Sequence, residues 1–442
     1  PIIKGEHHYN YVETPDHTYI AFGNKVFEVQ GDSILARHYF GDEIIRLYRD
    51  ASNNIWLSEK FHGVSMYKGS LDDGPQHHFF QDISVSSVLQ DKEGNYWFTT
   101  TENGVFFVPS LNLRVFNEQN IDIQNEVIVS LEVNGDDVFF STDHKEIYHA
   151  LISGDQLMNV QSLGNDREFI DNIYAILSYS DDILYITGDY MPGLPDSILV
   201  YKKDRFDVHA VEFGYNLVKA SDGTVILGQT NGIKIIRGNR ILYRTPIDLF
   251  DVRVFAVAES DTGLLLGTIS GLKIFKDGQY ASLDSIDPVL GSRITTLHNT
   301  ADRLWVGSFD DGLAVVSNDT VYHLDEANGL SSNRIKSMCI VNDTQAWIGT
   351  NRGLNRIDVK EGQYLQFDVR VLDIWDGLPS NEINEIRQQG NDIWLATDKG
   401  LVAFNPEILS YQPIPLTLVL DHVFLDTEQE LDPGQVAELN HN

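Results

Sequence analysis

One short pattern recurs ten times along the 442 residues: an apolar run with a large residue near its start, a polar turn that usually contains Gly, and a second apolar run. The clearest copies are QAWIGTNRGLNRID (345–358), RLWVGSFDDGLAVV (303–316) and DIWLATDKGLVAF (392–404). Two β-rich runs around such a turn predict a β-hairpin, because Gly adopts positive φ at no steric cost. Ten copies indicate one or two long repeat arrays rather than several unrelated domains.

The large residue in the first run of each copy, here called the anchor, sets the period of the repeat. Successive anchors are 37 to 47 residues apart, and five of the six Trp residues of the chain are anchors. Chance spacing explains that coincidence poorly. The anchors are Tyr19, Trp56, Trp97, Phe139, Tyr185, Ile226, Leu265, Trp305, Trp347 and Trp394.

Each copy is the middle of a longer unit of four short strands. In residues 333–370 the four runs are RIKSMCIV, AWIGT, LNRID and YLQFDV, and the first is the expected inner strand. Such repeats, without helical periodicity, predict an all-β fold: a β-propeller of about ten four-stranded blades of about 42 residues each. We expect each anchor to fill the wedge between adjacent blades, where Gly307 and Gly349 avoid a clash. The anchors are therefore expected to be structural, neither catalytic nor ligand-binding.

The repeats also predict how the chain is divided. The last seven, residues 112–412, are expected to close one ring, and the first three, residues 1–111, to belong to a neighbouring ring; a single larger ring is the alternative. Prolines in the stretch 410–434 then break the pattern, so residues 413–442 are expected to be a linker and the truncated start of another β domain. Because the chain opens on Pro1 rather than Met, we expect it to be a piece of a longer protein.

Composition narrows the classes of partner. With 32 basic and 65 acidic residues the net charge is −33, which argues against nucleic acid and anionic membrane surfaces, since phosphate binding needs Lys and Arg clusters. No apolar run approaches the roughly 18–20 residues of a membrane helix, so membrane attachment is expected only through missing downstream segments.

Cofactor chemistry has little support in the sequence. The one cysteine, Cys339, lies in an apolar run and is expected to be a buried side chain rather than a nucleophile. The pairs His7–His8 and His77–His78 lack the spacing that places two metal ligands on one helix face. We expect neither a metal nor another cofactor.

Two repeats share more specific elements. Residues 325–358 and 375–405 both contain GLSSN or GLPSN, then an Ile-containing strand, then W-I/L-G/A-T and x-x-G-L. They resemble the two-component regulator propeller repeat, and the resemblance extends over nearly the whole chain. It implies a sensor of a kind found mostly in Bacteroidetes, with propellers in the periplasm ahead of one membrane span and a histidine kinase. It also implies that an Ig-like β-sandwich begins near residue 413. Members commonly carry two seven-bladed propellers, whereas this chain has ten repeats.

Several members of that family sense oligosaccharides, so the resemblance implies a periplasmic sensor domain that recognises an oligosaccharide and passes the signal across the membrane. This region is expected to be non-catalytic, with the kinase activity in a missing cytoplasmic part, and to form a homodimer because kinases of this class work as dimers. One alternative is a propeller lyase or hydrolase acting on a glycan or a streptogramin-like substrate, for which His62 and His144 could start a catalytic cluster. Another is a scaffold that binds a protein through an exposed apolar patch. The neighbours Asp310 and Asp311 are more typical of a turn than of an acid/base pair.

The candidate ligand contacts lie in loops. In a propeller the turns between second and third strands and the loops between blades share one face, and binding residues concentrate in such loops. Aromatic faces stack on the C–H surfaces of sugars, and planar charged groups form paired hydrogen bonds with hydroxyls. The residues in these loops that we expect to contact a ligand are Lys60, Phe61, His62, Asp189, Tyr190, Phe213, Tyr215, Phe250, Asp251, Arg253, Phe309, Asp310, Asp311, Arg334, Arg352 and Trp375.

Overall fold

A computed structural model describes most of the chain. The described residues are 9–406, together with 423–425 and 429–431, but without 73, 76, 81–82, 93, 109–112, 119, 124–126, 144–145, 164–171, 181–182, 190–197, 203–204, 210–213, 239 and 247–251. They contain 41 strands and three short 3-10 helices, η1 (Pro288–Gly291), η2 (Glu326–Asn328) and η3 (Ile374–Asp376), and no helix long and apolar enough to cross a membrane. The all-β prediction is therefore confirmed.

The chain divides into two compact units, residues 1–408 and residues 409–442. In the smaller unit, the described strands β40 (Val423–Leu425) and β41 (Gln429–Leu431) pair antiparallel. All other strands belong to the larger unit.

Three antiparallel sheets come first in the larger unit. The first is made of β1 (Tyr9–Glu13), β2 (Thr18–Phe22), β3 (Lys25–Gln30) and β4 (Ser33–Tyr39). The second is made of β5 (Ile44–Arg49), β6 (Asn54–Glu59), β7 (Val64–Lys68) and β8 (His77–Phe79). The third is made of β9 (Val85–Gln90), β10 (Tyr96–Thr100) and β11 (Val105–Val108). This third repeat therefore has three strands among the described residues, and the expectation of four strands in every repeat is wrong there.

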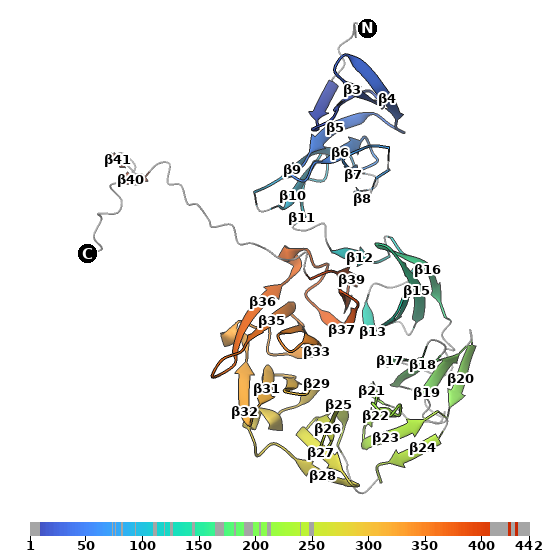
Figure 1. Cartoon of the computed structure of the whole chain (residues 1–442), viewed down its shortest axis with the longest axis vertical. Coiled ribbons are helices and arrows are strands. Elements are labelled where there is room, and N and C mark those ends of the chain that lie inside the picture. The colour runs from blue at the N-terminus through green and yellow to red at the C-terminus, as the bar shows by residue number, and fades with distance from the viewer. Residues whose placement is uncertain are drawn as a thin grey trace. The chain divides into compact units, whose positions relative to one another are not determined.

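Seven four-stranded sheets follow and form a closed ring, running from cyan to red in Figure 1. Six of them use consecutive strands, and the seventh has the order β12-β39-β38-β37, so the first strand of the ring completes its last blade. The first strands of successive blades pack on one another, and β37 packs back on β13. The result is a seven-bladed β-propeller, and the predicted propeller fold is confirmed.

The strands of the ring have the following bounds. The first three consecutive blades comprise β13 (Ile128–Asn134), β14 (Asp137–Thr142), β15 (Ile147–Ser153), β16 (Gln156–Ser162), β17 (Asn172–Ser180), β18 (Ile183–Asp189), β19 (Ile198–Lys202), β20 (Arg205–His209), β21 (Asn216–Lys219), β22 (Val225–Gln229), β23 (Gly232–Arg237) and β24 (Arg240–Arg244). The next three comprise β25 (Val254–Ser260), β26 (Gly263–Thr268), β27 (Gly271–Lys276), β28 (Gln279–Ser282), β29 (Ile294–Asn299), β30 (Leu304–Ser308), β31 (Leu313–Ser317), β32 (Thr320–Leu324), β33 (Ile335–Asn342), β34 (Gln345–Thr350), β35 (Leu354–Lys360) and β36 (Gln366–Leu372). The closing blade comprises β12 (Arg114–Phe116), β37 (Ile383–Gln389), β38 (Asp392–Thr397) and β39 (Gly400–Phe404).

All ten anchors lie on the second strand of their sheet, as the repeat predicts. Most fill the space between sheets. The anchors with 6% exposure or less are Tyr19, Trp56, Tyr185, Ile226, Leu265, Trp305, Trp347 and Trp394.

Trp97 and Phe139 depart from the expected wedge. An anchor faces the following sheet: Trp56, for example, packs against Tyr96 of sheet β9–β11. Among the described residues no sheet packs on the corresponding face of sheet β9–β11, because the next strand, β12, pairs with β39 of the ring instead. Trp97 is therefore 39% exposed. Phe139 is half-buried and stacks on His149 directly across the sheet, with ring centroids 4.7 Å apart.

Glycines after three anchors set the spacing between blades. A Cβ on Gly267, Gly307 or Gly349 would lie 2.7, 2.7 and 2.8 Å, respectively, from a Cγ2 atom of the isoleucine that begins the next blade. Real Cβ atoms essentially never approach so closely, which explains why glycine stands two positions after these anchors. The three isoleucines are Ile294, Ile335 and Ile383.

Charged side chains join the last blade to the first. Arg114 of β12 pairs with Asp392 of β38 within the closing blade, and its Nη1 lies 3.6 Å from a carboxylate oxygen of Asp155, between β15 and β16 of the first blade. On the inner strands, Arg387 of β37 donates from Nε to a Glu132 carboxylate oxygen of β13 at 3.1 Å. Glu385 of β37, which also pairs with Arg387, accepts a 2.9 Å hydrogen bond from a serine hydroxyl on β13. The ring is thus closed by an inserted strand and by an ionic network.

Candidate functional site

The first strand of each blade lies nearest the ring axis (Figure 1). Most of these strands have a β-bulge near their start. In six blades, one residue is skipped in the pairing with the second strand. In the remaining blade, Tyr215 stands directly before β21 and donates its N–H to the Gly228 carbonyl. A bulge leaves one residue unpaired and re-aims its side chain. The seven equivalent residues are Val129, Tyr174, Tyr215, Phe255, Thr295, Lys336 and Asn384.

Two positions before the bulge residue, three consecutive blades carry arginine. Arg253, Arg293 and Arg334 stand directly before β25, β29 and β33. The repeat places equivalent positions at equal heights around the ring, so the three guanidinium groups follow one arc of the same face. Among the described residues, the equivalent positions of the other blades hold Val127, Asn172 and Glu382.

Aromatic rings and these guanidinium groups form a continuous series across five consecutive blades, here called the aromatic–arginine row. It begins with rings: the centroids of Tyr174 and Tyr215 lie 5.4 Å apart, as do those of Tyr215 and Phe255. Arg253 lies over the Tyr215 ring with its Cζ 4.9 Å from the centroid. The members of the row are Tyr174, Tyr215, Arg253, Phe255, Arg293, Phe309 and Arg334.

In the second half of the row, arginine and phenylalanine alternate. The Cζ of Arg293 lies 4.6 Å from the Phe255 centroid and 4.3 Å from the Phe309 centroid. The Cζ of Arg334 lies 4.1 Å from the same Phe309 centroid. Each such cation–π contact contributes about 0.5–1 kcal/mol at an exposed site and more when desolvated. The contacts therefore hold the guanidinium groups in place without using their N–H donors.

Backbone hydrogen bonds fix the turn that carries Phe309. The Phe309 N–H donates to the Arg293 carbonyl at 2.9 Å, and the Gly312 N–H donates to the Asn333 carbonyl at 2.9 Å. The turn between β30 and β31 is thereby held between two inter-blade loops. The side chain of Phe309 consequently lies between the arginines of two neighbouring blades.

The structure brings four of the sequence-predicted ligand contacts together in the row: Tyr215, Arg253, Phe309 and Arg334. Asp310 and Asp311 follow in the turn after Phe309, where Asp311 accepts a hydrogen bond from the Ser292 hydroxyl at 2.5 Å. Arg352 lies in the next such turn and pairs with Glu326 at 3.6 Å. Its guanidinium therefore already has an acidic partner.

The other predicted contacts are not brought to this site. Lys60, Phe61 and His62 form the turn between β6 and β7, in a sheet outside the seven-bladed ring. There His62 Nδ1 lies 3.1 Å from an Asp42 carboxylate oxygen. Asp189 ends β18 and Trp375 lies in η3, but their side chains are not described. The predicted residues outside the described part of the chain are Tyr190, Phe213, Phe250, Asp251 and His144.

Sequence reasoning missed Tyr174, Phe255 and Arg293. Tyr174 and Phe255 lie inside first strands, which were expected to be structural, and only the bulge frees them from the ladder. Arg293 had a readable signal, since an Arg followed by Ile or Val opens three successive first strands, at RVFAV (253–257), RITTL (293–297) and RIKSM (334–338). Aligning the repeats on that pair of residues would have found it.

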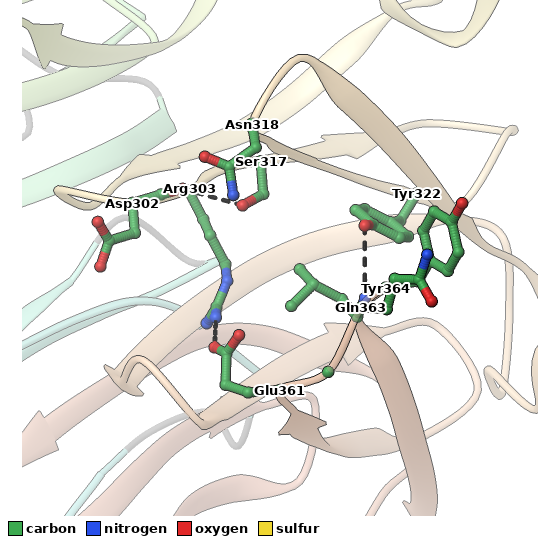
Figure 2. Close-up of a pocket in the computed structure, with 10 residues that line it drawn as sticks. Asp302, Arg303, Ser317, Asn318, Tyr322, Glu361, Gln363 and Tyr364 are labelled. Carbon is green, nitrogen blue, oxygen red and sulfur yellow. Dashed lines mark hydrogen bonds and ion pairs between the residues drawn. The ribbon is translucent and has the colours of Figure 1, made fainter.

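A cavity of about 310 Å³ lies between the blades β29–β32 and β33–β36 (Figure 2). Its walls come from the turns between first and second and between third and fourth strands, so it opens on the face opposite the row. The buried Arg303 guanidinium pairs with Glu361, and Leu365 donates its N–H to the Tyr322 hydroxyl at 3.3 Å. The cation of this pocket is therefore already matched by an acid, and the pocket ties the two blades together.

Groups for covalent or metal chemistry are scarce in the described part of the chain. No group of three His, Cys, Asp or Glu side chains that could hold a metal ion occurs among the described residues. Burial raises the pKa of the Cys339 thiol to about 11, with Arg387 opposing that rise. A thiol of that pKa is almost wholly protonated at neutral pH and is a poor nucleophile.

The chain matches no model of a known protein family, and no curated protein sequence matches it. Among solved structures, the extracellular domain of the hybrid two-component system BT3049 from B. thetaiotaomicron superposes with a TM-score of 0.72 at 15% identity, covering 94% of this chain and 59% of that one. The extracellular domain of the hybrid two-component system BT4673 from the same organism superposes with a TM-score of 0.53 at 14% identity, covering 91% of this chain and 59% of that one. This chain thus spans about three fifths of the length of these relatives. In its fold, it is similar to the extracellular domains of Bacteroides two-component systems, as the repeat motif implied.

Proposed function

We propose that this chain is part of the extracytoplasmic sensor region of a two-component regulator and that it binds an oligosaccharide on the face that carries the aromatic–arginine row. The observation that carries this proposal is the row itself: seven aromatic and guanidinium side chains from five successive blades at the inner rim of the ring. The fold shared with two-component extracellular domains supports the sensor context.

The chemistry of the row suits a sugar chain. An aromatic face stacks on the C–H surface of a pyranose, and Tyr174, 39% exposed, offers such a face beside Tyr215. A guanidinium provides two parallel N–H donors for paired oxygens, and the donors of Arg253 and Arg334 are not used by their ring contacts. A row several blades long fits an extended ligand better than a compact one.

Binding without turnover is the expected behaviour. The row contains no carboxyl pair of the kind a glycosidase places across the scissile bond. Asp311, the nearest acid that the sequence singled out, is engaged with Ser292 as a turn residue. The catalytic step of the regulator, a kinase reaction, is proposed to reside in parts of the protein outside this chain, as is the membrane span. A homodimer and the division into residues 1–111, 112–412 and 413–442 remain proposals as well.

The test is a thermal-shift screen of the purified chain against oligosaccharides of different composition, followed by calorimetric titration of each hit. A ligand at about 100 times its Kd should stabilise the chain by roughly 2.7 kcal/mol. Chromatography of the sugar after incubation shows whether any product forms.

Two aromatic variants locate the site. Tyr215→Ala removes a ring at the centre of the row, and Tyr364→Ala removes an exposed ring of the pocket on the opposite face. We expect Tyr215→Ala, but not Tyr364→Ala, to lose affinity for the oligosaccharide found in the screen. If only Tyr364→Ala loses affinity, the sugar binds in that pocket and not at the row. Turnover of the sugar would show that the chain is an enzyme rather than a sensor domain.

A further inference from the structure

The three arginines of the row have no acidic partner among the described residues, unlike six other arginines of the chain. No described carboxylate lies within 4.0 Å of Arg253, Arg293 or Arg334, whereas six other described arginines each form an ion pair. In a chain with 65 acidic and 32 basic residues, a cluster of unpaired cations runs against the average composition. The six paired arginines are Arg114, Arg237, Arg303, Arg352, Arg356 and Arg387.

The unpaired guanidinium groups are also close to one another. Arg293 and Arg334 lie 4.3 Å and 4.1 Å from the Phe309 centroid, so their Cζ atoms are separated by no more than 8.4 Å. Like charges at such a distance repel, and the repulsion is weakened only where a counter-charge is present. The electron-rich faces of Phe255 and Phe309 offset part of it. The arrangement leaves room for a further negative charge to stabilise it.

Arg293, in the middle of the arc, carries an additional sign of an unfilled interaction. Its Nε is buried and has no hydrogen-bond partner among the described residues. A buried donor without a partner is costly, and such exceptions require an explanation. Because this Nε is closed to solvent, an oxyanion at the row would contact the remaining N–H donors of Arg293, whose side chain is half-buried overall.

The cationic part of the row has a limited extent. In the blade that carries Arg334, the bulge residue Lys336 donates to the Glu382 carboxylate of the following blade, and its charge is thereby matched. In the other direction the row continues as the uncharged rings of Tyr215 and Tyr174. The row therefore has a neutral stacking half and a cationic half.

We infer that the oligosaccharide bound here is anionic: carboxylate or sulfate groups of the sugar chain lie over the arc of Arg253, Arg293 and Arg334, and a neutral sugar ring stacks on the tyrosine half of the row. This inference rests on the proposed function and names the chemical class of its ligand. Arginine suits both groups, because its planar fork forms paired hydrogen bonds with carboxylates and with tetrahedral oxyanions.

The experiment compares sugars that differ only in charge. Calorimetric titrations of the chain use a galacturonate tetramer and its methyl ester, and a dextran oligosaccharide and its sulfated form. We expect at least one charged probe to bind about tenfold or more tightly than its neutral partner, as expected for charge-assisted hydrogen bonds. The first pair tests carboxylate recognition and the second tests sulfate recognition.

Two variants of equal charge change show where the selectivity arises. Arg293→Gln removes the central cation of the row, and Arg240→Gln removes an exposed arginine on the outer strand β24. Arg293→Gln should weaken binding of the charged probe about tenfold and leave binding of its neutral partner unchanged. Arg240→Gln should change neither affinity. Thermal melting of both variants checks that the fold is retained.

The outcomes separate this inference from the proposed function. If neutral and charged partners bind equally, and binding depends on Tyr215, the sugar-binding function stands and the anionic ligand is refuted. Equal losses of affinity for the charged probe in Arg293→Gln and Arg240→Gln would show that the overall charge of the chain, not the row, attracts the anion. That result would also refute the inference of an anionic ligand at the row. Binding of none of the four sugars would contradict both.

Discussion

Replacing Gly349 with alanine would place a methyl group between two neighbouring blades. The new Cβ would lie 2.5 Å from the Ser337 Oγ in its own blade, and 2.8 and 3.1 Å from the Cγ2 and Cβ of Ile383 in the next. The Ser337 hydroxyl can rotate away, but the Cβ of Ile383 is fixed by its strand. The two blades must therefore separate by a few tenths of an ångström.

The expected loss follows from two opposing terms. Overpacking of this kind costs about 1–3 kcal/mol, and Gly→Ala at an unstrained position returns about 0.4–1 kcal/mol by restricting the unfolded chain. Ala396 occupies the equivalent position of the closing blade and is fully buried, so a methyl group is tolerated where the neighbouring blade is placed for it. We therefore expect Gly349→Ala to lower the free energy of unfolding by about 1–2 kcal/mol.

Urea unfolding followed by tryptophan fluorescence, and thermal melting, measure this loss against Gly291→Ala. At Gly291 the nearest atom to a new Cβ, Asp284 Cβ, is 3.4 Å away, so that control should change the stability by less than about 0.5 kcal/mol. Equal stability of the two variants would refute the view that the glycine after the anchor sets the distance between blades.

Trp56→Ala is expected to cost about 3–5 kcal/mol because the side chain is fully buried, whereas Trp97→Ala should cost about 1 kcal/mol or less in this chain; paired thermal melts compare them, and equal losses would contradict the difference in burial. At Asp50, burial would raise the pKa of the carboxyl, but hydrogen bonds, the strongest from Trp56, hold it below its usual value of 3.8. Its stabilising contribution is therefore present above pH 3.8 and is lost as the pH falls through the lowered pKa. Urea unfolding should show Asp50→Asn to be less stable than the wild type at about pH 7 and similar to it at about pH 2, and a constant difference would rule out this titration. Arg387→Met leaves the carboxylates of Glu132 and Glu385 without their shared cation and should cost about 2–3 kcal/mol, below the range for a fully buried pair because the Arg387 side chain is 34% exposed. Unchanged urea unfolding would show that the network does not hold the ring closed.

The blades were predictable because their pattern is local. An anchor, a turn and a second apolar run determine a hairpin, and the period of the anchors then determines the propeller. The strand that closes the ring was not predictable in this way. Its three residues, Arg114–Phe116, carry no part of the repeat, and their partners on β39 lie far along the chain. The exposure of Trp97 has the same origin, because its burial depends on a neighbouring sheet and not on its own motif.

The binding face was predictable only in part. Loop position identified Arg253, Phe309 and Arg334, which form cation–π contacts between neighbouring blades in the structure. Tyr174 and Phe255 were missed because alternation assigns them to a strand, and a bulge is not visible in a single sequence. The unpaired state of the arginines could not be read from composition, since a net charge of −33 suggests that every cation has an acid nearby.

Hydrogen–deuterium exchange of the chain, with and without the oligosaccharide that stabilises it most in the thermal screen, tests the location of the site most directly. The account predicts slower exchange, on ligand addition, in the segments that carry the aromatic–arginine row, and no change in the turns that line the pocket of Figure 2. Protection confined to residues 302–303 and 361–365, or protection of no segment of the row, would contradict it. The segments expected to be protected are residues 172–176, 214–217, 253–256, 292–296, 309–312 and 333–336.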